Sequence, residues 1–364
     1  MNASEYLLRR EERVLFALRQ LYRMRGYAQY KMGKFEEYDL YARNKDFLVS
    51  DGIITFTDTD GRLMALKPDV TLSIIKNTRD AENCVQKVYY SENVYRISGS
   101  TRQFKELMQT GLECIGDVDL YSLCEVISLA AQSLNAIHPA NVLELSHMGV
   151  VSALVGALDV EADVEKAVLK CIGEKNADGL RALCPNADIE AVLTLITAHG
   201  APEKVIDALR PHCRHGLAKA ALDELKAVTD CLKKLGHAAI QVDFSIVNDM
   251  NYYNGIVFMG YIEGIPTGVL SGGQYDKLMQ RMGRKSRAVG FAIYMDLLER
   301  MEAGASPYDV DTLLLYPEGT DPADLARVVR TLNETGRSVT AQRAIPEKLK
   351  YREVLRFEEV DGHA

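Results

Sequence analysis

The chain has 364 residues, enough for a large core and two or three domains. Hydrophobic residues make up 47% of it and charged residues 26%, an ordinary balance for a soluble globular protein. With a net charge of −8, the protein as a whole has no general attraction for nucleic acid, although a local basic patch remains compatible with this charge.

Neither a secretion signal nor a membrane anchor is expected. Residues 1–20 contain no apolar run of signal-peptide length, and the sequence shows no stretch that approaches a transmembrane span. The seven cysteines are an odd number and form no Cys-x-x-Cys pair. Reduced, buried thiols in a cytoplasm are therefore the expected state.

The first part of the chain alternates between helical and strand patterns. Residues 5–25 carry apolar side chains at helical spacing and stop at Gly26, which predicts an amphipathic helix. Residues 55–66 alternate on either side of a polar turn and predict a hairpin. A helix is expected at 71–77 and another at 117–136, followed by a short strand at 142–146.

A pair of strands between residues 88 and 115 carries the most informative side chains. Residues 88–95 are rich in aromatic and β-branched residues, and 107–115 form a second strand beyond a Gly- and Ser-containing turn. Arg96 ends the first strand, while Gln109, Gly111 and Glu113 share one face of the second. A cation, a carboxamide and a carboxylate on one side of a sheet suit a small zwitterion. An ordinary exposed strand face is the alternative.

The composition changes after Gly149. Residues 150–237 are rich in Ala and Leu and nearly free of aromatic residues, which predicts several short packed helices. His212, Cys213 and His215 lie close together there, but no further ligand stands at a recognisable metal-site spacing, so no metal is expected.

Strand patterns return after residue 238 and a βαβ-like fragment follows a linker at 304–307. Strands are expected at 240–246, 255–264, 267–270, 312–316 and 338–342, and helices at 288–301 and 322–335.

Four segments in order resemble the class II aminoacyl-tRNA synthetases, and most closely the histidyl-tRNA synthetases. Residues 89–113 are similar to motif 2, and residues 26–71 to the motif 1 region with the ligand loop that follows it. Residues 248–258, NDMNYYNGIVF, resemble the histidine-specific loop. Residues 271–298 resemble the Gly-Gly-x-Tyr-Asp stretch and motif 3.

This resemblance implies an α+β fold of the class II synthetase type, an antiparallel sheet flanked by helices. Residues 1–149 and 238–303 would form this catalytic-type domain, with a helical insertion at 150–237. Residues 304–364 would be a truncated α/β C-terminal fragment at the place of the family's anticodon-binding domain. Class II domains usually dimerise, so a homodimer is the expected minimal unit.

The resemblance also implies a nearly complete histidine pocket. Asp69, Thr71 and Gln109 match the partners of the substrate ammonium, with Asp in place of the family's usual Glu. Arg96 matches the motif 2 arginine that reaches the carboxylate. The groups that match the readers of the imidazole and its pocket are Glu113, Tyr253 and Tyr275.

The nucleotide side departs from the family pattern. Asn248 stands where the histidine-specific loop has an arginine, and Leu297 follows Asp296 where motif 3 ends in another. Ser98 replaces the acidic residue two positions after the motif 2 arginine. Removing one preorganised donor lowers a rate by roughly a hundred- to a thousandfold, so adenylation at a useful rate is not expected.

An intact amino-acid pocket beside a dismantled nucleotide site resembles the regulatory subunits of short-form ATP phosphoribosyltransferase. That resemblance implies a non-catalytic protein without a cofactor, which activates a separate catalytic subunit and mediates histidine feedback in the first step of histidine biosynthesis. It implies neither tRNA nor membrane as a partner. Two alternatives remain: a divergent histidyl-tRNA synthetase or amino-acid adenylating ligase, for which Lys105, Arg281 and Arg284 would be replacement cations, and a stand-alone histidine-binding module.

Overall fold

The computed structural model describes residues 10–48, 52–80, 82–97, 102–246, 252–298 and 307–360. The chain divides into two compact units. The larger comprises residues 14–301, and the smaller comprises residues 302–364 together with 1–13. Each unit is described by itself.

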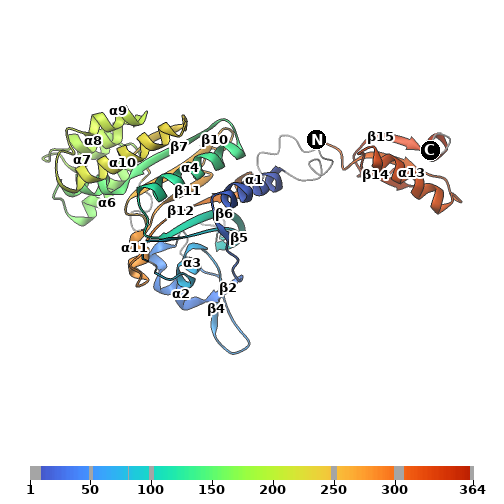
Figure 1. Cartoon of the computed structure of the whole chain (residues 1–364), viewed down its shortest axis with the longest axis horizontal. Helices are drawn as coiled ribbons and strands as arrows, with labels where there is room; N and C mark the ends of the chain where they lie inside the picture. Colours follow the sequence, from blue (N-terminus) through green and yellow to red (C-terminus); the bar gives the residue numbers. More distant parts are fainter. Residues whose placement is uncertain are drawn as a thin grey trace. The chain divides into compact units, whose positions relative to one another are not determined.

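A nine-stranded sheet forms the centre of the larger unit, in the order β1-β5-β6-β12-β11-β10-β7-β9-β8 (Figure 1). Neighbouring strands are antiparallel except for the pairs β1–β5 and β7–β9. The longest pair, β5 with β6, corresponds to the two strands predicted at 88–95 and 107–115. Each strand extends further than the sequence pattern indicated. The strands are β1 (Ala28–Gln29), β5 (Val85–Ile97), β6 (Phe104–Gly116), β7 (Asn141–His147), β8 (His199–Gly200), β9 (Ile240–Asp243), β10 (Ile256–Ile262), β11 (Leu270–Gln274) and β12 (Arg287–Tyr294).

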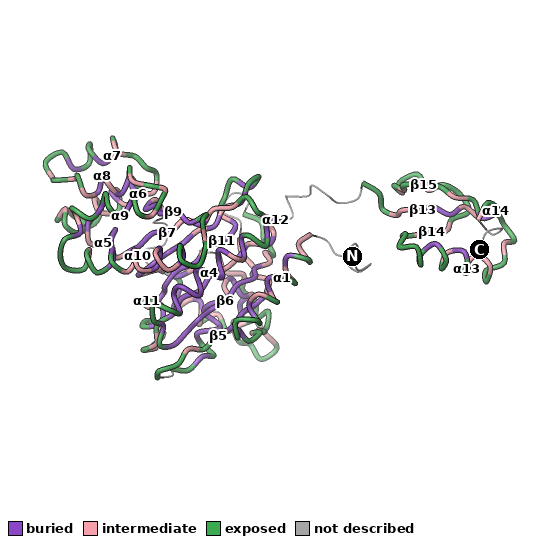
Figure 2. The backbone as a smooth tube through the Cα atoms, turned by 45° about the horizontal axis from the view of Figure 1, so that its top comes forward, coloured by how far each residue is buried: buried purple, intermediate pink, exposed green. Residues whose placement is uncertain are grey.

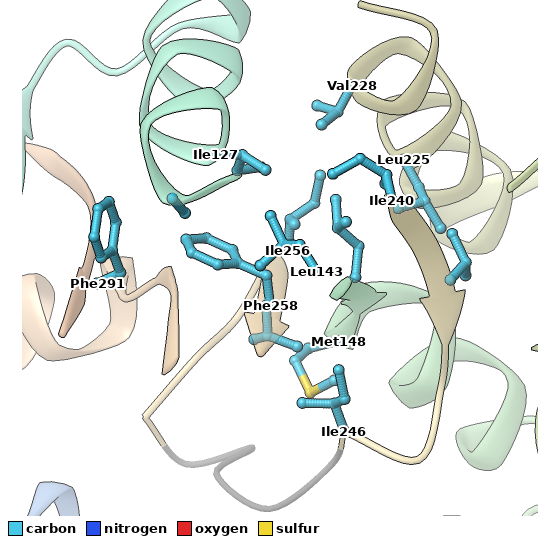
Figure 3. Packing of buried hydrophobic residues seen from close by; sticks show 14 of the residues in the cluster. Ile127, Leu143, Met148, Leu225, Val228, Ile240, Ile246, Ile256, Phe258 and Phe291 are labelled. Carbon is cyan, nitrogen blue, oxygen red and sulfur yellow. The ribbon is translucent and has the colours of Figure 1, made fainter. Parts of the chain in front are cut away.

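One face of this sheet is covered by helices α1 (Arg10–Met24), α4 (Leu120–Ile137) and α10 (Gly216–Lys234). Helix α1 buries Val14, Leu18 and Tyr22, which recur every four residues and so share one face. The apolar side chains of α4, α10 and the strands beneath them form one continuous core (Figure 3). This face of the sheet is stabilised by apolar burial.

Helix α4 is apolar enough, by length and composition, to cross a membrane, so the expectation that no stretch approaches a span was too strong. Its surroundings explain the composition, because 72% of the helix is buried inside the protein. The side chain of Asp119 caps the helix by accepting a hydrogen bond from the Ser122 amide. Helix α4 is therefore a buried core helix of the larger unit.

The opposite face of the sheet carries a second core, formed mainly by the N-terminal part of the chain. A small antiparallel sheet of β2 (Phe35–Glu37), β4 (Leu63–Leu66) and β3 (Thr55–Thr57) contains the predicted hairpin. This second core is completed by side chains from α2 (Tyr38–Arg43), the short 3₁₀ helix η2 (Lys45–Phe47), α3 (Thr71–Asn77) and α11 (Asp276–Arg281). These elements surround a stretch of β5, β6, β11 and β12 that remains open to a ligand.

Between β7 and β9 the chain forms the expected run of helices, which gathers beside the sheet at the β7 side (Figure 1). Figure 2 shows buried segments both in these helices and in the sheet. Their buried apolar residues belong to one hydrophobic core. The helices that precede α10 are α5 (Met148–Gly156), α6 (Ala162–Gly173), α7 (Ala177–Leu183), α8 (Glu190–Thr197) and α9 (Pro202–Leu209).

Three predicted boundaries after residue 238 are wrong. The helix expected at 288–301 is instead strand β12, and only α12 (Met295–Leu298) is helical among its described residues. β12 is buried on both faces and therefore lacks the alternation that identifies a half-exposed strand. Residues 244–246 and 267–269 are not in strands, because β9 ends at Asp243 and β11 begins at Leu270.

The smaller unit contains a parallel sheet in the order β14-β13-β15. The predicted βαβ fragment corresponds to β13 (Val310–Leu315), α13 (Pro322–Glu334) and β14 (Val339–Gln342), whereas β15 (Tyr351–Arg356) and α14 (Phe357–Val360) were not predicted. Leu314, Val328, Leu332 and Phe357 form its small core.

Candidate functional site

A cavity opens on the face of the sheet opposite α4, and all of the predicted pocket residues line it. They come from four separate segments of the chain: the start of α3, the hairpin β5–β6, the loop before β10 and the end of β11. The residues that the structure brings together in this way are Asp69, Thr71, Arg96, Gln109, Glu113, Tyr253 and Tyr275. The period of two along β6 places Gln109 and Glu113 on this face, as expected.

Glu113 lies at the bottom of the cavity and is only 2% exposed. The Thr71 hydroxyl donates to Glu113 Oε1 at 2.8 Å, and the Tyr275 hydroxyl donates to Oε2 at 2.5 Å. Burial raises the pKa of Glu113 to about 8, although both hydrogen bonds act in the opposite direction. The carboxyl lies directly over Gly290, where a Cβ atom would stand 1.7 Å from Oε2. Glycine is therefore required at that position of β12.

Asp69 is the second carboxylate of the cavity and stands just before α3. Its Oδ1 accepts a hydrogen bond from the Leu72 amide at 2.9 Å, which satisfies one free donor at the start of that helix. Burial raises the pKa of Asp69, while this backbone bond and the nearby Arg96 guanidinium partly offset the shift. Asp69 is thus a carboxylate held in a fixed orientation and ready to accept from a cation.

Arg96 provides the positive charge of the site. Its Nε donates to the Pro68 carbonyl at 2.9 Å, which fixes the plane of the guanidinium. Of the described residues that line the cavity, only Arg96 carries a positive charge.

An aromatic wall closes the cavity beside Glu113. The Tyr252 ring lies 4.7 Å from that of Tyr253, 5.8 Å from that of Tyr275 and 6.2 Å from that of Phe47, measured between centroids. Reciprocal hydrogen bonds between Asn254 and Asp276 hold the two tyrosine-bearing segments together. The wall is therefore apolar on its faces and polar at its hydroxyls, which suits a flat ring with nitrogen atoms.

Several lining residues were missed by the sequence analysis, notably Phe47, Tyr90, Tyr252, Ser271 and Tyr294. The pattern contained a signal for one of them, because Tyr90 lies on β5 at an even spacing from Arg96 and so shares its face. Phe47 comes from a segment far away in the sequence, and no local pattern places it at the site.

The two positions that the sequence analysis matched to nucleotide-binding arginines of the family are occupied by the uncharged residues Asn248 and Leu297. Leu297 packs against the main hydrophobic core, whereas Asn248 lies outside the described residues, as does Ser98 at the position matched to an acidic residue. The Arg281 guanidinium donates to the Arg43 carbonyl and lies 5.6 Å from the centroid of the Phe47 ring.

The other two proposed replacement cations do not supply that charge either. Arg284 donates to the carbonyls of Ile75 and Lys76. Lys105 is exposed and, like Arg281 and Arg284, does not line the cavity. Within the parts of the chain that the structure describes, no group of three or more His, Cys, Asp or Glu residues could hold a metal ion.

Comparisons with known proteins agree with this geometry. Residues 4–298 match the family model described as histidyl-tRNA synthetase. Proteins called ATP phosphoribosyltransferase regulatory subunit are similar in sequence. The one from Bacillus cereus is 26% identical over 90% of this chain and 81% of its own length. The one from Clostridium botulinum is 26% identical over 83% of this chain and 75% of its own length.

Solved structures share the fold at low sequence identity. An ATP phosphoribosyltransferase regulatory subunit/histidyl-tRNA synthetase from Bacillus halodurans has a TM-score of 0.78 at 22% identity, covering 95% of this chain and 93% of its own. A histidyl-tRNA synthetase from Nostoc has a TM-score of 0.73 at 17% identity, covering 93% and 83%. A chain of the ATP phosphoribosyl transferase complex from Thermotoga maritima has a TM-score of 0.62 at 20% identity, covering 78% and 97%. The chain has the α+β fold of the class II synthetases and belongs to the histidyl-tRNA synthetase family.

Proposed function

We propose that this chain is the non-catalytic regulatory subunit of a short-form ATP phosphoribosyltransferase. In this role it activates a separate catalytic subunit and binds histidine, the end product that inhibits the complex. One observation carries the proposal: a single cavity is lined by all seven residues that were matched to the family's histidine pocket, and Arg96 is the only cation among its described lining residues. The names and the complex of the relatives support the same role.

The chemistry of the cavity fits each part of histidine. Asp69, with Thr71 and Gln109 beside it, is placed to accept the ammonium, and Arg96 to pair with the carboxylate. The imidazole is a flat ring with one donor and one acceptor nitrogen. Glu113 and the hydroxyls of Tyr253 and Tyr275 can hydrogen-bond to that ring inside the aromatic wall.

The same cavity is poorly equipped for adenylation. Transfer of an adenylyl group builds negative charge on the α-phosphate, and this charge requires preorganised cations. Arg281 and Arg284 do not line the cavity, and their guanidinium groups donate to backbone carbonyls. Leu297 is apolar. The chain therefore acts by binding rather than by chemistry of its own.

The proposal includes a homodimer inside a hetero-oligomer in the cytoplasm, with no tRNA or membrane partner. Allosteric inhibition requires that histidine bind two states of the complex with different affinity, and such coupling is typically about 1–3 kcal/mol. The division into a catalytic-type domain, a helical insertion at 150–237 and a C-terminal fragment at 304–364 is part of this proposal.

Purification from the native host followed by a transferase assay tests the proposal directly. We expect a short catalytic transferase to co-purify, to be activated by this chain and to be inhibited by histidine only in its presence. The isolated chain should not exchange pyrophosphate into ATP when histidine is added. Exchange at the rate of a synthetase would favour the divergent ligase instead. Histidine binding without any transferase partner would favour a stand-alone binding module.

A further inference from the structure

A buried ion pair lies next to the candidate pocket and has no place in the function proposed above. The Lys67 side chain is only 1% exposed, and its Nζ donates to Glu92 Oε2 at 2.5 Å. Glu92 is itself largely buried, with 17% of its side chain exposed. Neither residue lines the cavity. A fully buried ammonium is rare in a protein core and is found there with a partner.

The segment that carries Lys67 bears directly on the two charged groups of the cavity. The Lys67 carbonyl accepts a hydrogen bond from the Tyr95 amide at 2.9 Å, so this segment runs along β5 beside Arg96. The next residue, Pro68, accepts from Arg96 Nε, and the one after it is Asp69. Three consecutive residues therefore fix, in turn, the ion pair, the guanidinium of Arg96 and the second carboxylate of the cavity.

Glu92 anchors this segment to the strand that carries Arg96. Glu92 lies on β5 four residues before Arg96, an even spacing that places both on the same face of the sheet. It stands opposite Gln109 of β6 in the strand register. The ion pair thus ties the segment 67–69 to the floor of the cavity, immediately next to the groups that would bind the ligand's charges.

We infer that Lys67 and Glu92 are positioning residues, which hold Asp69 and Arg96 at the spacing required by the ammonium and carboxylate of an amino acid. This inference rests on the proposed histidine site and adds two residues to it. Removing one partner of a buried pair leaves the other charge uncompensated, either Lys67 on the segment 67–69 or Glu92 on β5. The segment and the strand must then shift against each other to bring that charge to water. Such a movement displaces Asp69 and the carbonyl that orients Arg96. The imidazole end of the cavity is built on Glu113 and Tyr275, and the Thr71 hydroxyl, two residues beyond Asp69, joins it to this part of the chain. We therefore expect a smaller effect at that end.

The test compares histidine with imidazole alone as ligands of the full-length chain. Calorimetry gives the Kd of histidine, and a titration followed by NMR gives that of imidazole. The variants are Lys67→Met, Glu92→Gln and the double variant Lys67→Met with Glu92→Leu, which leaves no buried charge unpaired. Lys76→Met is the matched control, because it breaks the pair (2.7 Å) between Lys76 of α3, whose side chain is 43% exposed, and Glu36 of β2.

We expect each single variant to raise the Kd of histidine about tenfold or more while changing that of imidazole by less than about threefold. The control should change neither value by more than about twofold. An equal loss for both ligands would show a general loss of structure and overturn the inference, and so would an unchanged histidine Kd. Should Lys67→Met fail to fold, Glu92→Gln decides, because it must show the same ligand-selective loss. The double variant, in which no buried charge is unpaired, should lose less histidine affinity than either single variant, and an equal loss would overturn the role of the unpaired charge. A wild-type chain that binds imidazole but not histidine would refute the histidine site and this inference together, whereas normal wild-type binding with unaffected variants would refute the inference alone.

Discussion

The two faces of the nine-stranded sheet bury their side chains to a similar degree but with opposite chemistry. On the helix face, Leu112 of β6 is fully buried in a core of apolar residues. Its neighbour in sequence, Glu113, is 2% exposed on the other face and is surrounded by hydroxyl groups. Burial of the first residue stabilises the fold, whereas burial of the second raises a pKa and opposes ionisation. Burial of a carboxyl group such as Glu113 is therefore better explained by ligand binding than by folding, although the same face also carries the second, apolar core.

The largest effect that separates the faces is expected from Leu112→Ala. It leaves a cavity in the helix-side core, and such truncations cost about 2–5 kcal/mol of folding stability. The pocket residues stay in place, so histidine affinity should change little in the fraction that remains folded. Urea unfolding measures the first quantity and calorimetry the second. A stability loss below about 1 kcal/mol would mean that this face relaxes around the missing atoms.

The next effect is expected on the pocket face, from Glu113→Ala and Asp69→Ala. A hydrogen bond to a charged group contributes about 1.5–3 kcal/mol, so each variant should weaken histidine binding about ten- to a hundredfold above about pH 8, where Glu113 is ionised. Assembly should depend on surfaces outside the cavity. Both variants should therefore still activate the transferase, yet require far more histidine for inhibition. If these residues only satisfy one another inside an unused cleft, calorimetry will detect no histidine binding and inhibition will be unchanged in both variants.

The sequence predicts which residues lie on each face of the sheet only where a local pattern along one strand determines it. The period of two along β6 placed Gln109 and Glu113 together, and the resemblance to the family added Asp69, Arg96 and the tyrosines. β12 was misread as a helix because both of its faces are buried and its apolar run shows no alternation. The Lys67–Glu92 pair joins a residue between β4 and α3 to strand β5, 25 residues further along the chain, and only the folded chain shows that they meet.

A smaller effect distinguishes the faces through pH. The pKa of Glu113 is raised from 4.5 to about 8 in the folded protein, so between these values the folded state holds a proton that the unfolded state has lost. Stability due to this group is therefore highest below about pH 4.5, falls as the pH rises towards about 8, and is constant above it.

Glu113→Gln cannot ionise, so it should gain stability relative to the wild type across that pH window. Thermal unfolding of the ligand-free wild type and variant at several pH values measures the difference. Parallel profiles would show that Glu113 ionises in the folded protein as it does in water.

The smallest effect is expected where an ion pair is exposed rather than buried. Lys219 and Asp223 form a pair one turn apart on α10, with 56% and 59% of their side chains exposed. Water screens both charges, and pairs of this kind contribute about 0.3–0.5 kcal/mol. Lys219→Met should therefore change the free energy of unfolding by no more than this, and should leave histidine affinity unaltered. Lys67→Met removes the same charge from a buried pair and should be far more costly, because Glu92 cannot regain full hydration without movement of the chain. If urea unfolding gives similar losses of unfolding free energy for Lys219→Met and Lys67→Met, Glu92 is hydrated as readily as a surface carboxylate. The buried and the exposed ion pair would then not differ in energy.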